Sequence, residues 1–210
     1  MSHDGDADRA LFCDENGSAL DGDEILAIAA VHMIGEGSLK DNTLVATVMS
    51  NAGLEEAVSQ VGGQVIRASV GDRYVLQKMK ERGYNFGGEQ SGHFIFLDHN
   101  TTGDGLVSAL QLLRIIKETG KPLSELRKVL TKSPQIQRNL RVKKKPELKE
   151  MKALVKVAEI ESELGDGGRV LIRYSGTEPL LRILVEGRDT EQIKTKINEL
   201  AAAIEEEIGV

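Results

Sequence analysis

The chain has 210 residues, of which 40% are hydrophobic, 29% charged and 3% aromatic. These values are typical of a globular protein, and the length suits one large or two modest domains at about 150 residues per domain. The formal net charge of −6 argues against nucleic acid as a partner, because polyanions attract basic surfaces. A single cysteine excludes an internal disulfide, and no apolar run approaches the ~20 residues that span a membrane. We therefore expect a cytoplasmic protein with neither nucleic acid nor a membrane as its partner.

Strand and helix patterns alternate along the first part of the chain. Short apolar or β-branched runs, the last folded around a glycine-rich bend, predict strands at 10–13, 43–49, 64–68 and 85–97. Helical patterns lie between and after them, at 25–31, 54–61, 74–82 and 106–119. The turn at 14–17 predicts a hairpin, and the acidic residues at 21–23 predict a helix cap. We expect residues 1–132 to form an α/β/α sandwich domain with a mixed sheet.

The pattern changes after about residue 132. Alternating or apolar stretches predict strands at 135–142, 169–174 and 180–186, and charged amphipathic stretches predict helices at 147–164 and 190–208. This order indicates that residues 133–210 form a small α+β domain with an antiparallel sheet. The triple lysine at 143–145 is interpreted as a solvated strand end, because no aromatic residue interleaves it.

Three carboxylates alternate with small residues near the start of the chain, at Asp4, Asp6 and Asp8. Carboxylates with this spacing can converge on one hard divalent cation, and the adjacent Arg9 is placed to meet a phosphate beside it. A calcium-binding EF-hand loop is disfavoured, because that loop needs glycine where Arg9 stands. The sequence favours a catalytic Mg²⁺ loop over an ordinary acidic turn, which is the alternative.

A glycine-flanked heptapeptide, residues 87–93, carries a carboxylate, a hydroxyl and an imidazole. Glu89 and Ser91 stand two residues apart, so an extended chain points both the same way, which suits neighbouring hydroxyls of a sugar. His93 is a candidate proton carrier near neutral pH. The alternative for His93 alone is a purely structural histidine.

A tight loop between the last two predicted strands combines hydroxyls, a glycine and arginines. Backbone N–H groups in such a loop form an anion nest, to which hydroxyls add donors and arginines add charge. A phosphate monoester is the ligand that fits best, and a hairpin with ordinary surface arginines is the alternative. The candidate residues are Arg173, Ser175, Gly176, Thr177 and Arg182. A weaker signal at 69–73 is either a ligand-steering helix start or a cap with a surface arginine.

These segments, in this order, resemble those of the α-D-phosphohexomutases, and the resemblance extends over essentially all of the chain. The matching segments are Asp4–Arg9, Val70–Val75, Gly88–His93 and Arg173–Arg182. With Gln90, this segment resembles that of the glucosamine branch of the family, whereas the mannose and glucose branches tend to have methionine at this position. The resemblance implies reversible conversion of glucosamine 6-phosphate to glucosamine 1-phosphate on the route to UDP-N-acetylglucosamine, through an active-site phosphoserine and Mg²⁺.

The resemblance also implies residue roles. Asp4, Asp6 and Asp8 would hold Mg²⁺, while Arg9 would contact the phosphoserine. Glu89 and Ser91 would bind sugar hydroxyls beside His93, a general base. The non-reacting phosphate would be bound by Arg173, Ser175, Gly176, Thr177 and Arg182.

The chain departs from the family pattern in one respect. The family has four domains, and its serine lies in the first, in a Thr-Ala-Ser-His-Asn-like loop that does not occur here. The chain therefore resembles the third and fourth domains alone, with the N-terminal domains as its partner, and we expect it to be inactive alone and to bind Mg²⁺ weakly. Residues 1–3 are interpreted as an expression scar or a new start. Mannose or glucose phosphates as substrates, a non-catalytic phosphosugar-binding module, and self-association into a homo-oligomer are left open.

Overall fold

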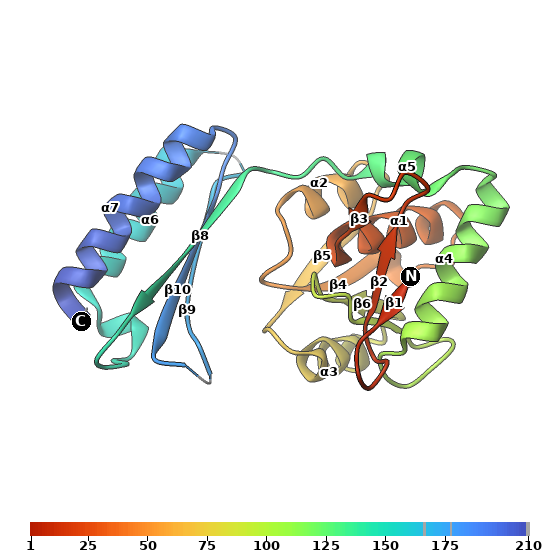
Figure 1. The fold of residues 1–210 in the computed structure, drawn as a ribbon, viewed down its shortest axis with the longest axis horizontal. Coiled ribbons are helices and arrows are strands. Elements are labelled where there is room, and N and C mark those ends of the chain that lie inside the picture. Colours follow the sequence, from red (N-terminus) through yellow and green to blue (C-terminus); the bar gives the residue numbers. More distant parts are fainter. Residues whose placement is uncertain (166, 177, 209–210) are drawn as a thin grey trace. The chain divides into compact units, whose positions relative to one another are not determined.

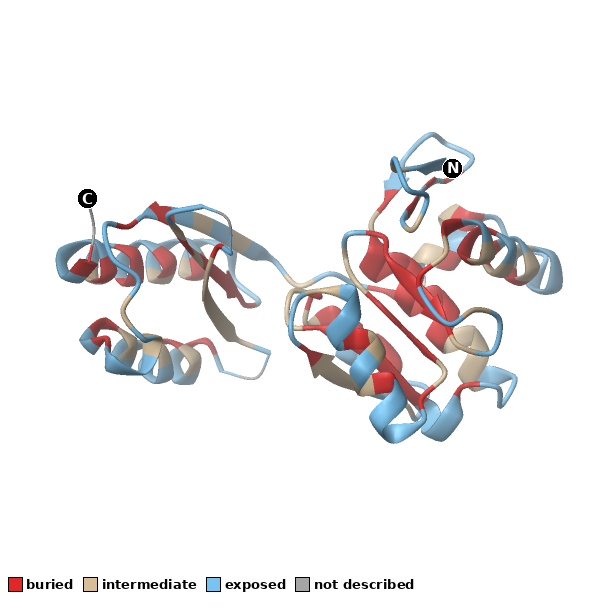
Figure 2. Cartoon of the chain, turned by 90° about the horizontal axis from the view of Figure 1, so that it is seen from below, coloured by how far each residue is buried: buried red, intermediate tan, exposed pale blue. Residues whose placement is uncertain are grey.

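The structure is a computed structural model that describes residues 1–165, 167–176 and 178–208. The chain divides into two compact units, Met1–Lys132 and Ser133–Val210 (Figure 1). Each unit has its own hydrophobic core, and its buried residues gather where helices and strands face one another (Figure 2).

A four-stranded sheet lies at the centre of the first unit. Its order is β5-β4-β6-β7, where β4 runs parallel to both β5 and β6, and β7 runs antiparallel to β6. The strands are β4 (Thr43–Thr47), β5 (Gln64–Ala68), β6 (Phe86–Gly88) and β7 (Phe94–Phe96). The predicted mixed sheet is confirmed, although β4 ends at Thr47, where the sequence pattern extended it to residue 49.

Helices cover both faces of this sheet. Along β4, Leu44 and Ala46 pack into the larger core with four of the helices, whereas Val45 packs on the opposite face with α3, as expected from the alternation of side chains in a strand. The helices are α1 (Gly22–Gly35), α2 (Gly53–Ser59), α3 (Asp72–Arg82), α4 (Gly105–Thr119) and the short α5 (Leu123–Leu126), with 3₁₀ turns η1 (Lys40–Asn42) and η2 (Arg127–Val129). The α/β/α arrangement expected from the sequence is confirmed.

Local signals account for the ends of several helices. Asp21 caps α1, where its side chain accepts from the backbone N–H of Glu24 while the Glu24 side chain accepts from Asp21 N–H, a reciprocal capping box. Gly83 and Gly120 end α3 and α4 in the left-handed conformation, which costs glycine no Cβ clash. The predicted cap at 21–23 is therefore correct for Asp21.

A small three-stranded sheet lies at the start of the chain. The strands β1 (Ser2–His3), β2 (Ala10–Cys13) and β3 (Ala19–Leu20) form it in that order, all antiparallel. The β2–β3 hairpin was expected. Ser2 and His3, in the segment interpreted as an expression scar or a new start, pair with Leu11 and Ala10 in this sheet.

The second unit has a three-stranded antiparallel sheet with two longer helices packed against it. The strands β8 (Gln135–Arg141), β9 (Arg169–Tyr174) and β10 (Leu180–Glu186) stand in the order β8-β10-β9, and the helices are α6 (Val155–Leu164) and α7 (Thr190–Ile208). Alternate residues of β10, namely Leu181, Ile183 and Val185, enter the core. The predicted antiparallel sheet is confirmed.

One predicted helix is too long. The pattern at 147–164 predicted a single helix, but α6 begins only at Val155, after the 3₁₀ turns η3 (Leu148–Glu150) and η4 (Lys152–Leu154). Between these turns, Met151 is buried with an extended backbone. Burial of this side chain breaks the helix, which shows tertiary packing overriding helical propensity. Within the described ranges, no helix is long and apolar enough to cross a membrane.

Candidate functional site

The carboxyl ends of the parallel strands of the first unit bring together two of the predicted segments. β5 is followed by the loop that leads to Gly71, and β6 is followed directly by Glu89. Ligands in α/β sheets commonly bind at this edge. Here the backbone N–H of Gly71 donates to Glu89 Oε1 at 2.8 Å, so a hydrogen bond joins the 69–73 segment to the glycine-flanked loop.

The glycine-flanked loop is a tight turn. Glu89 N–H donates to the His93 carbonyl at 2.8 Å, and Gly92 N–H donates to the Glu89 carbonyl at 3.1 Å. Gly92 has φ +96°, and a Cβ there would lie 2.7 Å from the Ala10 carbonyl oxygen, so glycine is required on two counts. The turn brings Ser91 Oγ to 3.4 Å from Glu89 Oε2. The hydroxyl and the carboxylate therefore lie together because the chain turns here, not because it is extended as the sequence interpretation assumed.

The start of α1 packs against this turn and supports it. Gly22 N–H donates to the Gln90 carbonyl at 2.9 Å, and a Cβ on Gly22 would stand 2.2 Å from the Glu89 carbonyl oxygen. The two backbones approach so closely that only glycine fits.

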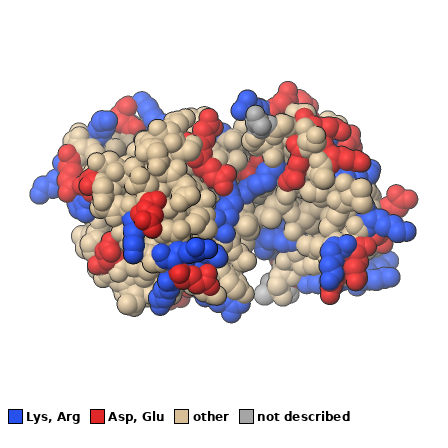
Figure 3. Space-filling model, turned by 180° about the vertical axis from the view of Figure 1, so that it is seen from behind, with Lys and Arg blue, Asp and Glu red and all other residues tan. Residues whose placement is uncertain are grey.

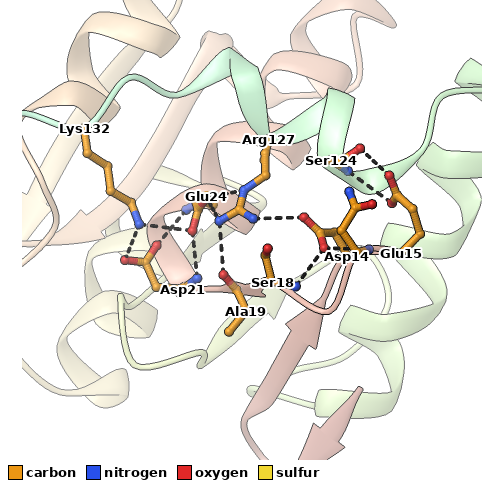
Figure 4. Close-up of polar contacts among 10 residues, drawn as sticks. Asp14, Glu15, Ser18, Ala19, Asp21, Glu24, Ser124, Arg127 and Lys132 are labelled. Carbon is orange, nitrogen blue, oxygen red and sulfur yellow. Dashed lines mark hydrogen bonds and ion pairs between the residues drawn. The ribbon is translucent and has the colours of Figure 1, made fainter.

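An ion-pair network, drawn in Figure 4, fixes the start of α1 in turn. The Arg127 guanidinium contacts Glu24 at 2.6 Å and Asp14 at 3.1 Å, and Lys132 contacts Glu24 at 3.0 Å and Asp21 at 2.8 Å. The side chains of Asp14 and Glu24 are almost fully buried. Through Arg127 and Lys132, the network therefore joins the last residues of the first unit to the capping box of α1, the helix that supports the turn.

The acidic loop folds its three carboxylates together. One oxygen each from Asp4, Asp6 and Asp8 lies within 4.8 Å of the others, with Ala7 between them in the left-handed region at φ +59°. Arg9 Nε contacts Asp4 Oδ2 at 2.6 Å and is half exposed. Although desolvation opposes ionisation, the hydrogen bonds and charge of Arg9 lower the pKa of Asp4. The loop therefore brings three carboxylates together, one of which, Asp4, is paired with Arg9.

His93 joins the acidic loop to the glycine-flanked loop. Its ring is buried, with Nδ1 3.6 Å from Asp8 Oδ2 and Nε2 4.0 Å from Asp72 Oδ2. The backbones also meet, because Ala10 N–H donates to the Gly92 carbonyl at 3.0 Å. Among the described residues, neither Asp8 Oδ1 nor His93 Nε2 has a hydrogen-bond partner, although both atoms are buried.

The second unit places two arginines opposite each other. Arg173 on β9 and Arg182 on β10 are direct partners in the antiparallel register. Within the described part of the chain, the buried Nε atoms of both lack hydrogen-bond partners. Desolvation and the charge of Arg182 lower the pKa of Arg173. Like charges facing each other across a strand pair are destabilising. Glu178 Oε2, 2.9 Å from Arg182 Nη2, offsets part of this charge, and an anion between the arginines would offset more.

The loop beyond these arginines is held by its backbone. Ser175 is buried, its N–H donates to the Leu180 carbonyl at 2.8 Å, and its Oγ accepts from Glu178 N–H at 3.2 Å. Gly176 is exposed with open space where a Cβ would stand. Thr177 lies outside the described residues. Lys145 Nζ donates to the Ser175 carbonyl at 2.8 Å, so this lysine is part of the loop structure as well as of the basic run.

Two residues that the fold brings to these sites, Asp72 and Lys145, have no specific role in the sequence analysis. Asp72 lies in the weak signal at 69–73 and Lys145 in the basic run at 143–145, but their contacts with the His93 ring and the Ser175 carbonyl depend on packing between distant segments. Charge alone would not have found them, because basic and acidic side chains are interspersed over the face in Figure 3.

Another cluster links the C-terminal ends of α1 and α4. His32 Nε2 lies 3.2 Å from Glu36 and 3.0 Å from Glu118, and Arg114 pairs with both glutamates. Since the arginine already balances these carboxylates, the cluster acts as an ion-pair bridge between the two helices.

The chain matches two family models. The model described as phosphoglucomutase/phosphomannomutase, alpha/beta/alpha domain III, matches residues 21–133, and the model of the C-terminal domain of the same family matches residues 138–204.

Curated relatives are similar over nearly all of the chain. Phosphoglucosamine mutase of Syntrophotalea carbinolica is 55% identical over 211 residues, an alignment that covers 100% of this chain and 46% of the relative. The Bdellovibrio bacteriovorus protein of the same name is 49% identical, with the same coverage of both chains. The chain thus spans about half the length of the curated relatives it matches.

Solved structures share the fold at lower identity. Aspergillus fumigatus N-acetylphosphoglucosamine mutase, in complex with GlcNAc-6P and magnesium, aligns with a TM-score of 0.78 and 20% identity over 96% of this chain and 51% of that one. A phosphoglucomutase/phosphomannomutase family protein from Burkholderia thailandensis aligns with a TM-score of 0.76 and 21% identity, covering 98% and 46%.

Proposed function

Since the chain belongs to the phosphoglucomutase/phosphomannomutase family, we propose that it forms the metal-, sugar- and phosphate-binding half of a phosphoglucosamine mutase. The reaction would interconvert glucosamine 6-phosphate and glucosamine 1-phosphate. The observation that carries the proposal is the contact of His93 with Asp8, which joins the acidic loop to the glycine-flanked loop. A metal and a sugar would therefore meet at one place on the first unit.

The acidic loop fits Mg²⁺. Three carboxylates converge within 4.8 Å, and oxygen ligands are those that Mg²⁺ prefers. Asp8 Oδ1 is buried without a hydrogen-bond partner in the described residues, and its cationic neighbour is Arg9 Nε at 3.6 Å, so this oxygen has room for a metal contact. We propose Asp4, Asp6 and Asp8 as its ligands; when bound, Mg²⁺ would offset negative charge on a phosphoryl group.

The glycine-flanked loop would recognise the sugar. Glu89 is anchored through one oxygen by Gly71 N–H, which leaves its other oxygen and Ser91 Oγ beside each other for a pair of hydroxyls. The His93 ring lies between Asp8 and Asp72, and we propose that it exchanges a proton with the substrate. Arg9, half exposed beside the carboxylates, would contact the phosphoserine.

The loop of the second unit would hold the phosphate that does not react. The facing pair Arg173 and Arg182 supplies charge, and Ser175 with Gly176 supplies a hydroxyl and an open backbone position. Thr177 is proposed from the sequence alone. Support for a phosphosugar ligand comes from the Aspergillus relative, whose structure holds GlcNAc-6P and magnesium.

We expect the 210-residue chain alone to show no turnover. Phosphoryl transfer of the proposed kind needs a phosphoserine, and no Thr-Ala-Ser-His-Asn-like loop occurs in this sequence. For the same reason Mg²⁺ affinity should be weak, since one ligand of the complete site is missing. Metal-dependent turnover by the chain, free of any longer mutase, would contradict this. A cytoplasmic location stays a prediction.

NMR titration of the isotope-labelled chain with glucosamine 6-phosphate tests the proposal, with glucose 6-phosphate as the comparison. Shifts are expected at Gly176 and over 89–93, larger for the amino sugar. Equal shifts with both sugars would favour a glucose or mannose substrate instead. No shift at either loop, in a sample whose spectrum shows that both units are folded, would contradict sugar and phosphate binding by these residues.

A further inference from the structure

Helix α4 exposes an apolar stripe that the proposed active site does not use. Leu106, Leu110 and Leu113 are 60%, 56% and 59% exposed, although leucine is normally buried. Their i, i+4, i+7 spacing places them on one face of the helix. The opposite face, with Ala109, Leu112 and Ile115, packs into the core. The helix is therefore apolar on two faces, only one of which is covered in this unit.

Within the described ranges, other exposed apolar residues do not form such a stripe along a helix. Val61, in the turn after α2, and Val155, at the start of α6, are single exposed side chains, which is ordinary for a protein surface. Three large leucines along one helix, with Lys117 as the next residue on that face, make a contiguous patch of the kind that marks an interaction site.

The first residues of the chain lie directly beside this stripe. The His3 ring packs against Gly105, the first residue of α4, so closely that a Cβ there would stand 2.4 Å from Nδ1. Gly105 N–H also donates to the Ala7 carbonyl at 3.0 Å. The leucine stripe therefore begins next to the point where polypeptide preceding β1 would enter this unit.

We propose that the leucine stripe is the docking face for the part of the mutase that precedes this region in the longer relatives. The curated relatives extend over about twice the aligned length, and the family models matched here are the third and the C-terminal domain. A preceding domain joined at β1 is held near α4 by its covalent connection, which gives it a high effective concentration at the stripe. Its complementary surface is apolar and covers all three leucines.

Hydroxyl-radical footprinting with mass spectrometry tests the proposal. It compares the 210-residue chain with a chimera in which this chain replaces the matching part of the Syntrophotalea carbinolica enzyme. Labelling of Leu106, Leu110 and Leu113 is expected to fall several-fold in the chimera, because labelling follows exposed area. Val155, 70% exposed in the second unit, serves as the control and should label equally in both.

Two results would overturn the proposal. Equal labelling of the leucines in both proteins would show that nothing docks there. Protection of the leucines in the 210-residue chain alone, rising with concentration together with a dimer in sedimentation, would assign the stripe to a second copy. If the chimera does not fold, the preceding half of the relative is added in trans, and the same labelling decides.

A double variant adds a second measurement. Leu110→Ser with Leu113→Ser should leave the 210-residue chain folded with only a small loss of stability, because both side chains are more than half exposed and serine is a weaker helix former, and should restore Leu106 labelling in the chimera. Val155→Ser should change neither. The inference rests on the proposed function for the existence of the longer mutase, but footprinting needs no sugar binding, so its failure is separate from failure of the titration.

Discussion

Asp23 shows what burial does to one ionisable group. It lies in the first turn of α1, fully buried, with Oδ2 accepting from Asn51 N–H at 2.8 Å. Burial raises its pKa from 3.8 to about 6. The raised pKa means that protonated Asp23 stabilises the folded state. This contribution is fully present below pH 3.8 and is lost as the pH rises through about 6.

Asp23→Asn should remove this pH dependence. Between pH 4 and pH 8 the parent should lose about 2 kcal/mol more of its unfolding free energy than the variant, an order-of-magnitude figure from the shifted pKa. Urea unfolding at the two pH values measures it. The exposed Asp41→Asn is the matched control and should follow the parent. Identical pH dependence of parent and Asp23→Asn would show that burial is not the cause.

Gly92 is the residue on which the glycine-flanked turn depends. Gly92→Ala should lower the unfolding free energy by about 1–3 kcal/mol, because it puts a Cβ both at positive φ and against the Ala10 carbonyl. Gly5→Ala is the control, since a Cβ at Gly5 meets nothing within 4 Å. Equal stability of the two variants by thermal unfolding would mean that the turn relaxes freely.

At the scale of elements, Arg127 holds the start of α1 in place. It is the shared partner of two nearly buried carboxylates, Asp14 and Glu24. Loss of Arg127 removes the ion-pair partner of Asp14 and leaves Glu24 with Lys132 alone, and a buried charge that loses its partner is strongly destabilising. Because α1 supports the turn at Glu89 through Gly22, weakening this network should also loosen the candidate sugar site.

Arg127→Ala should therefore cost about 3 kcal/mol of unfolding free energy, as for other buried pairs. Lys128→Ala removes the neighbouring, exposed pair with Glu125 and should cost at most about 1 kcal/mol. Hydrogen exchange of the 89–93 turn gives the second readout and should rise only in Arg127→Ala. A loss no larger than that of Lys128→Ala would rule out the network as a structural support.

At the scale of the whole molecule, each unit carries its own core. The first unit has a larger core, with residues from α1, α2, α4, α5 and one sheet face, and a smaller one between the other face and α3, and the core of the second unit includes residues of β8, β10, α6 and α7. The candidate metal and sugar residues lie on the first unit, and the candidate phosphate residues lie on the second.

Residues 133–210 expressed alone should fold and retain binding of inorganic phosphate. NMR would follow the Ser175 and Gly176 amides during a phosphate titration, and Arg182→Ala should abolish their shifts, whereas Arg188→Ala, at an exposed position outside the loop, should not. A dispersed spectrum without phosphate-dependent shifts would contradict phosphate binding by this loop, while an undispersed one would contradict independent folding.

The sequence by itself determined the order of the longer elements, many of their ends and the composition of the three candidate loops. It missed β1 and α5, and it bounded α1 at 25–31 where the helix spans Gly22–Gly35. Hydrophobic period, capping acids and glycine stops are local properties, so they can be read over a few residues, as for β5, α7 and the Asp21 cap. The phosphohexomutase resemblance also came from short ordered segments, and the family models agree with it.

Only the tertiary structure decided what lies against what. The contact of His93 with Asp8, the register that sets Arg173 opposite Arg182, and the late start of α6 after buried Met151 each depend on packing between distant segments. The burial that raises the pKa of Asp23, which the sequence analysis treated only as part of a helix cap, also depends on such packing. Desolvation and close approach arise only when remote parts of the chain meet, and no local pattern of residue types contains them.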